Sequence, residues 1–232
     1  MWKKTDKWKP GRLGTASAGF GVQDSDSGTT GFAKKQFAHR EKLASDLAER
    51  IGVAVPKVVV DRIDGAADLY AISQAHGKES IDLTLLRDRL ADRFNSPEVK
   101  DAIKQASGLL PFHAWVATQD LKDEHLVVAT DRAGAYTIAA IDFAYSLDLP
   151  PPDGGPVQLP TGPPTLAANV DKNIVEATVQ KIESVTDDDI HAIVQALPAE
   201  LADDNEKVRL ANGLIGRRAK IRAVMQSQGW MP

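Results

Sequence analysis

Apolar and polar positions change their spacing several times along the first third of the chain. Turns rich in glycine, serine and threonine separate short β-like pieces, of which 18–23 and 29–36 are the best strand candidates. From 38 to 51 the apolar residues recur at helical spacing, and Gly52 offers a natural end for that helix. The pattern therefore predicts two strands followed by a helix.

A dense run of β-branched residues follows the predicted helix. Residues 53–62 read as a buried strand, and an early proline marks its start. Asp64 and Gly65 form a turn signal, and 69–74 is the return strand. We therefore predict a small antiparallel sheet that carries one helix, and we assign it to an N-terminal lobe of residues 1–76.

The remaining residues, 77–232, have a mainly helical pattern. Helices are predicted at 80–94, 97–110, 172–185, 187–197 and 205–228. Two strands, 126–130 and 135–141, form a β-hairpin between them. Residues 149–164 hold seven of the 13 prolines, which predicts a surface loop or an extended wrap instead of a helix or central strand. Two lobes of this kind leave a cleft in which ligands commonly bind.

Composition narrows the class of protein without changing this architecture. The 232 residues are 43% hydrophobic and 26% charged, which is ordinary for a soluble globular protein. The net charge of -4 argues against nucleic acid as the main ligand. The chain has no cysteine, which excludes disulfides, thiolate metal sites and thiol catalysis. We see no signal peptide or membrane span and expect a soluble, cytoplasmic protein.

Candidate chemistry gathers at one end of the predicted hairpin. Its first strand starts just after His125 and its second ends just before Asp142, so antiparallel pairing places the loop 120–125 beside Asp142. The two carboxylates of Asp120 and Asp142 and the imidazole could hold a divalent cation, and a free carboxylate can accept a proton. Aspartate is also common in turns, so hairpin geometry alone leaves a site and an ordinary loop equally open.

A second pattern favours phosphotransfer. Kinases use a strand lysine on the phosphates, a helix glutamate that fixes this lysine, a catalytic-loop aspartate, a metal ligand in the same loop and a second metal-binding aspartate. The same residue types occur here in the same order, as Lys34 or Lys35, Glu41, Asp120, His125 and Asp142. Their order and spacing indicate a kinase-like ATP site.

These residues and their flanking segments resemble HipA-like kinases, more specifically the compact bacterial HipA-like kinase domain, which is related to phosphoinositide-kinase-like folds. The likeness is carried by 31–34, 40–48, 51–56, 112–126 and 141–147. The resemblance implies an α+β, two-lobed protein-kinase-like fold. Its small antiparallel β lobe would carry one helix, and its larger, mainly helical lobe would hold a β-hairpin.

The resemblance also implies how ATP would be held. Lys34 would contact the α- and β-phosphates, with Lys35 as the alternative because strand parity does not choose between them, and Glu41 would pair with that lysine. The adenine would meet the backbone of the segment that joins the lobes, Ser73, Gln74 and Ala75. The stretch 15–21 could cover the phosphates with backbone N–H groups and the Ser17 hydroxyl, or it could form an ordinary hairpin turn.

For catalysis, the resemblance implies that Asp120 is the base and that His125 and Asp142 hold Mg²⁺ or Mn²⁺. The family typically has asparagine where this chain has His125, and imidazole suits softer metals, so His125 points to Mn²⁺ preference, altered activity or a degenerate site. The implied function is ATP-dependent transfer of the γ-phosphate to a hydroxyl of a protein serine or threonine, a lipid headgroup or a metabolite. The alternatives are a pseudokinase that acts as a nucleotide-binding interaction module and, more weakly, a metal-dependent hydrolase.

Overall fold

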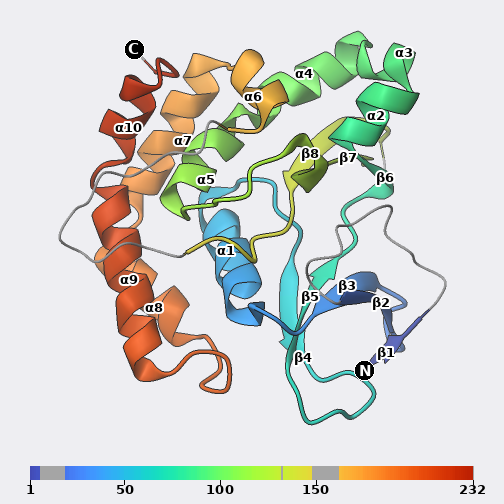
Figure 1. Ribbon diagram of the computed structural model, residues 1–232, viewed down its shortest axis with the longest axis vertical. Helices are drawn as coiled ribbons and strands as arrows, with labels where there is room; N and C mark the ends of the chain where they lie inside the picture. The colour runs from blue at the N-terminus through green and yellow to red at the C-terminus, as the bar shows by residue number, and fades with distance from the viewer. Residues whose placement is uncertain (6–18, 132, 148–161, 232) are drawn as a thin grey trace.

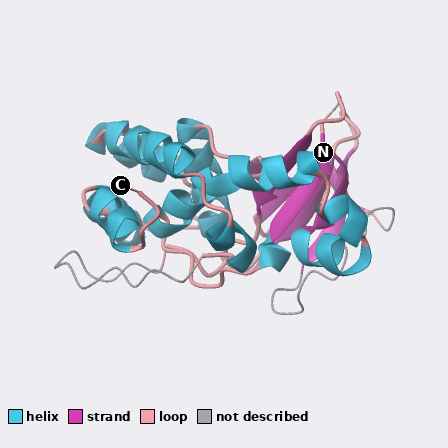
Figure 2. Cartoon of the chain, turned by 90° about the horizontal axis from the view of Figure 1, so that it is seen from above, coloured by secondary structure: helices cyan, strands magenta, loops and turns pink. Residues whose placement is uncertain are grey.

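The computed structural model describes residues 1–5, 19–131, 133–147 and 162–231 (Figure 1). The described chain contains two antiparallel sheets and a larger set of helices. Figure 2 shows the strands together towards one end of the molecule and the larger group of helices towards the other. Within these residues, no helix combines the length and the apolar character that are needed to cross a membrane.

The first sheet is antiparallel, with strand order β1-β2-β3-β5-β4. Its strands are β1 (Trp2–Lys4), β2 (Gly19–Asp24), β3 (Thr30–Lys34), β4 (Val58–Asp61) and β5 (Tyr70–Gln74). The prediction lacked β1, which pairs with β2 and buries Trp2 in a small core with Val22 and Ile72. The predicted strand 53–62 is shorter, because its first residues run towards the second sheet, where Ala54 accepts a backbone hydrogen bond from Ala140.

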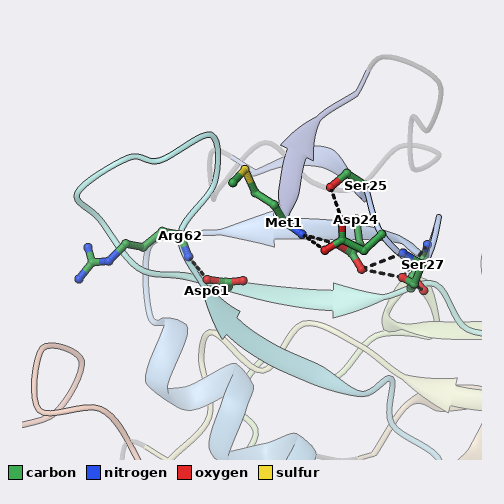
Figure 3. A network of polar contacts seen from close by, with 8 residues as sticks. Met1, Asp24, Ser25, Ser27, Asp61 and Arg62 are labelled. Carbon is green, nitrogen blue, oxygen red and sulfur yellow. Dashed lines mark hydrogen bonds and ion pairs between the residues drawn. The ribbon is translucent and has the colours of Figure 1, made fainter.

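A polar network holds the turn between β2 and β3 (Figure 3). The amino group of Met1 lies 2.7 Å from Asp24 Oδ1 and 2.9 Å from Asp26 Oδ2, and Ser27 donates a hydrogen bond to Asp24. Hydrogen bonds from the amino group and from serine side chains lower the pKa of both carboxyl groups. The network fixes the turn that leads into β3.

The predicted helix is confirmed as α1 (Ala38–Ile51), and Gly52 ends it in the left-handed region with a φ of 70°. Its apolar face, which includes Leu43 and Leu47, packs in the main core with the helices of the second half of the chain. Figure 1 shows α1 between β4–β5 and the C-terminal helices α8 and α9. A helix next to the sheet therefore belongs to the core of the helical part.

The second sheet has strand order β6-β7-β8, with β6 (Lys78–Asp82), β7 (Leu126–Thr130) and β8 (Tyr136–Ala140). The last two strands confirm the predicted hairpin. Residues 80–82 were predicted as helix, and this was wrong: Ile81 pairs with Val128 in β7. The helix α2 (Leu83–Arg89) starts only after Asp82, whose side chain accepts a hydrogen bond from the backbone N–H of Leu85.

Short and medium-length helices make up the rest of the described chain. They are α3 (Ala91–Phe94), α4 (Pro97–Gln105), α5 (Leu109–Trp115), α6 (Pro164–Ala168), α7 (Lys172–Ser184), α8 (Asp187–Gln195), α9 (Asp204–Arg218) and α10 (Ile221–Ser227), with the 3-10 turns η1 (Ala106–Gly108) and η2 (Asp123–His125). The long helix predicted over 205–228 is interrupted at Lys220, where φ is -109°.

The proline-rich segment lies mostly outside the described residues. The prediction of a surface loop over 149–164 is therefore not tested up to residue 161. Its last residue, Pro164, does start a helix, since proline at the first helical position costs no hydrogen bond. Gly162 and Pro163 are buried, so these two residues pack against the body of the protein just before α6 begins.

Candidate active site

Lys34 is the last residue of β3 and joins three elements. Its Nζ lies 3.0 Å from Oε1 of Glu41 in the first turn of α1, and 2.9 Å from Oδ1 of Asp142 beyond β8. Lys34 and Glu41 are 8% and 2% exposed, so the pair is shielded from water. Lys35 is directed elsewhere, to the exposed Asp68 at 2.8 Å. The structure thus brings Lys34, and not Lys35, to Glu41 and Asp142.

Burial and charge oppose each other in this cluster, and charge prevails. Burial lowers the pKa of Lys34, but the negative charges of Glu41 and Asp142 and their hydrogen bonds outweigh it and raise that pKa above its ordinary value. Burial raises the pKa of Asp142, but Lys34 and, to a smaller extent, His125 bring it below its ordinary value. At neutral pH the cluster therefore holds the ammonium group of Lys34 against the carboxylate of Asp142.

The loop 120–125 meets Asp142 as the hairpin geometry predicted. Leu126 pairs with Ala140, and the N–H of Ile141 donates to the carbonyl of His125 at 2.8 Å. The side chain of His125 turns back onto the loop, with Nδ1 2.9 Å from the carbonyl oxygen of Asp120. A carbonyl can only accept, so Nδ1 carries a proton and donates it to this oxygen, which leaves Nε2 as the nitrogen that could bind a metal ion.

The free nitrogen of His125 faces the carboxylate of Asp120. Nε2 lies 3.9 Å from Asp120 Oδ2, and the same oxygen is 2.9 Å from Nζ of Lys122. Asp120 is half-buried, and its carboxylate is reachable from outside. Lys122 was not among the site residues predicted from the sequence, although its position two residues after Asp120 was a usable signal.

The donors fit a metal ion that arrives with phosphate groups better than one held by the protein alone. Among the described residues, no three side chains of His, Asp or Glu are grouped so that they could hold a metal ion. Asp142 and His125 offer two donor side chains, which lie close enough for the charge of His125 to lower the pKa of Asp142. Mg²⁺ bound to nucleotides commonly takes only one or two protein ligands and completes its shell with phosphate oxygens and water.

Asp123 anchors the loop and was also missed in the sequence. It is buried, and its carboxylate accepts hydrogen bonds from the Thr165 N–H at 3.1 Å, from the Thr165 hydroxyl at 2.6 Å and from Arg87 Nη1 at 3.0 Å. These bonds join the loop to α2 and α6. No local pattern predicts them, because both partners are far from Asp123 in the chain.

The segment predicted to meet adenine lies where the chain leaves β5 of the first sheet and runs to β6 of the second. Ser73 and Gln74 belong to β5, and Ala75 follows it. The N–H of Gln74 donates to the carbonyl of Lys57 at 2.9 Å, and that of Ala75 donates to the carbonyl of Thr30 at 3.0 Å. These two amides are therefore used within the first sheet. In the stretch 15–21, residues 19–21 are part of β2, and Ser17 lies outside the described residues.

A buried histidine, His113, lies on the helix that precedes the loop 120–125. His113, on α5, is 2% exposed, and burial, followed by repulsion from His125, lowers its pKa from 6.5 to about 3. Above pH 6.5 the ring is neutral in the folded and unfolded states. Below pH 6.5 the unfolded chain binds a proton that the folded chain does not, so stability falls with pH down to about pH 3, by about 1.4 kcal/mol per pH unit.

Replacing His113 with phenylalanine should remove this acid sensitivity. Urea unfolding at pH 7.5 and at pH 5 gives the free energy of unfolding at each pH. Between these two values the wild type should lose on the order of 2 kcal/mol more of that free energy than the variant. The exposed His191, changed to glutamine, is the matched control and should leave the pH dependence close to that of the wild type. If the free energy of unfolding depended on pH in the same way in the wild type and in the His113 variant, the expectation would be contradicted.

Comparison with known proteins identifies the fold. No family model and no curated protein matches the sequence. Among solved structures, the proinflammatory kinase CtkA of Helicobacter pylori matches with a TM-score of 0.66 and 14% identity, over 97% of this chain and 95% of CtkA. HipA of Shewanella oneidensis MR-1, solved with HipB and operator DNA, matches with a TM-score of 0.57 and 12% identity, over 94% of this chain and 66% of HipA. The chain therefore has an α+β, HipA-like kinase fold, which confirms the fold class and the resemblance found in the sequence.

Proposed function

We propose that the protein is an ATP-dependent phosphotransferase that moves the γ-phosphate to a hydroxyl acceptor. The observation that carries the proposal is the position of Lys34, whose Nζ lies 3.0 Å from Glu41 and 2.9 Å from Asp142. Kinases place a strand lysine, a helix glutamate and a metal-binding aspartate together in this way around the phosphates of ATP. The kinase-like fold supports the same reading.

In this proposal residues 1–76 form the nucleotide-binding lobe and 77–232 the catalytic lobe. Lys34 contacts the α- and β-phosphates, and Glu41 holds its ammonium group in place. The adenine meets backbone groups of the connecting segment Ser73, Gln74 and Ala75. Because the amides of Gln74 and Ala75 already donate within the sheet, carbonyl oxygens are the groups that we assign to adenine there. Ser17 stays our candidate for a phosphate contact.

Asp120 acts as the base. Its carboxylate takes the proton of the acceptor hydroxyl while that oxygen forms a bond to the γ-phosphorus and the bond from this phosphorus to the β,γ-bridging oxygen breaks. Lys122, 2.9 Å from the same carboxylate, adds positive charge beside the transferred group. Asp142 and Nε2 of His125 would hold Mg²⁺ or Mn²⁺, which neutralises phosphate charge when it is bound. Positioning and charge provide most of the acceleration.

One observation favours a second function, a pseudokinase that binds nucleotide as an interaction module. His125 stands where the family typically has asparagine, and imidazole is a poorer ligand for Mg²⁺. Incubation with γ-labelled ATP and either Mg²⁺ or Mn²⁺, with and without a generic protein acceptor, separates the cases. Labelled protein supports phosphotransfer, and nucleotide binding without turnover supports the pseudokinase. Free phosphate without labelled acceptor supports hydrolysis, and absence of ATP binding overturns the proposal.

Asp142→Asn should make ATP binding independent of metal. The wild type should gain more thermal stability from ATP with Mn²⁺ or Mg²⁺ than from ATP with EDTA, whereas the variant should gain equally in both, because a neutral amide is a weak ligand for a hard cation. The backbone should tolerate the change, since Asp142 has a φ of 64° and asparagine adopts that region readily. Asp131→Asn in the β7–β8 turn is the matched control and should retain the metal effect.

A further inference from the structure

We propose that His113 is a positioning residue for the phosphotransfer site. It holds the loop of Asp120 and the segment of Asp142 in a fixed relation to each other, and it does so through Thr118 and Phe143. This role rests on the proposed function of the same site. It assigns a task to a buried imidazole that takes no part in the chemistry itself.

The first link runs through hydroxyl groups. Nδ1 of His113 lies 3.1 Å from Oγ1 of Thr118, and the hydroxyl of Ser146 donates to the same Oγ1 at 3.0 Å. All three side chains are buried. Thr118 is two residues before Asp120, and Ser146 is four residues after Asp142. The three groups therefore connect the segment that leads into one candidate residue with the segment that leaves the other.

Backbone hydrogen bonds run alongside these side-chain contacts. The N–H of Gln119 donates to the carbonyl of Tyr145 at 3.0 Å, and that of Leu147 donates to the carbonyl of Val116 at 2.7 Å. Three residues in these segments have φ angles in the left-handed region, Ala117 at 52°, Asp142 at 64° and Leu147 at 63°. Such conformations persist only where neighbouring contacts determine them. The hydroxyl contacts and the backbone hydrogen bonds described above provide these contacts on both sides of the site.

The second link is aromatic. The imidazole of His113 stacks on the ring of Phe143 with centroids 5.7 Å apart and an angle of 22° between the planes. Phe112 packs on the same ring edge to face at 5.8 Å. Phe143 directly follows Asp142 and is buried, so fixing its ring restricts the backbone that carries the Asp142 carboxylate. One side chain thus touches both segments that converge on the site.

Packing alone does not account for a histidine at this place. Among the described residues, Nε2 of His113 has no hydrogen-bond partner, and a buried polar atom without a partner is unfavourable. Phenylalanine would fill similar space, keep the stack on Phe143 and bury no such nitrogen. Phenylalanine would lose the contact of Nδ1 with Thr118. This contact holds the residue that lies two positions before Asp120.

The test uses variants that each remove one half of this contact. His113→Phe keeps a ring, and Thr118→Val keeps the shape of the side chain while it removes the hydroxyl. In a phosphotransfer assay each should lower kcat by about 10- to 100-fold with the KM for ATP nearly unchanged. The double variant should be no slower than the slower single variant, because both changes remove the same contact. His191→Gln, at an exposed position, is the control that should retain full kcat.

A second measurement follows position directly. Hydrogen exchange of the backbone amides in 116–119 and 143–147 should be faster in both variants, while the melting temperature of His113→Phe at pH 7.5 stays at or above that of the wild type. Unchanged exchange, kcat effects that multiply in the double variant, or a kcat loss that only follows lost stability would overturn the role of His113. A wild type that transfers no phosphate overturns the proposed function instead, and an active wild type matched by both variants overturns the positioning role alone.

Discussion

Asp120→Asn is expected to lower kcat for phosphate transfer by about 10²- to 10⁴-fold and to leave ATP binding nearly unchanged. The amide cannot take the hydroxyl proton, but its oxygen can still accept from Lys122, which lies 2.9 Å from Asp120 Oδ2 in the wild type. The backbone carbonyl of Asp120, which accepts from His125 Nδ1, is not altered. The variant therefore removes a proton acceptor without removing the contacts that shape the loop.

The measurement pairs single-turnover transfer from γ-labelled ATP with calorimetry of ATP binding. Glu124→Gln is the matched control, because it removes one negative charge from an exposed position of the same loop, and its transfer rate should stay close to that of the wild type. Turnover by Asp120→Asn at the rate of the wild type would remove Asp120 from the role of base. Equal losses in both variants would show that the charge of the loop, and not the proton acceptor, determines the rate.

The features that could be predicted from the sequence are those that local patterns determine. Helical spacing and a glycine located α1, whose end at Gly52 is confirmed by a φ of 70°. Runs of β-forming residues around a turn located β7 and β8. Antiparallel pairing then follows from chain connectivity, so the neighbourhood of the loop 120–125 and Asp142 was predictable. The structure confirms that the two lie side by side: Leu126 pairs with Ala140, and the N–H of Ile141 donates to the carbonyl of His125.

The features that escaped prediction depend on partners far along the chain. Residues 80–82 have the spacing of the helix that follows them, and they become a strand because β7 lies beside them. Trp2 joins the first sheet through pairing of β1 with β2, at positions that no periodicity in so short a strand could indicate. Asp123 finds its partners in α2 and α6. Each case is a tertiary contact that overrides a weak local preference.

The choice between Lys34 and Lys35 shows the same limit at the site. Both residues lie at the end of a predicted strand, and adjacent side chains on a strand face opposite sides. Which side faces α1 is decided by the packing of the helix on the sheet. Lys34 is directed to Glu41 in α1, and Lys35 pairs with Asp68 at the surface. The sequence could therefore limit the choice to Lys34 and Lys35, but it could not show which of the two lies on the side of the sheet that faces α1.

Lys34→Met is expected to destabilise the protein by about 3–5 kcal/mol and to abolish ATP-dependent transfer. The change leaves the carboxylate of Glu41, which is 2% exposed, buried without the ammonium group that lies 3.0 Å from it. Asp142 also loses Lys34 but is more exposed, so water can replace part of that interaction. Adding Glu41→Gln removes the buried charge, so the double variant should regain much of the stability while transfer stays absent.

Urea unfolding and transfer assays on the two single variants and the double variant separate these two effects. Lys35→Met is the matched control: Lys35 is 59% exposed and pairs with an exposed aspartate, so its loss should leave both the stability and ATP binding close to those of the wild type. A stable double variant without activity means that the charge of Lys34 is required by the phosphates and not only by the fold. Recovery of transfer in the double variant, or an equal loss of activity in Lys35→Met, would contradict the assignment of Lys34 to the phosphates.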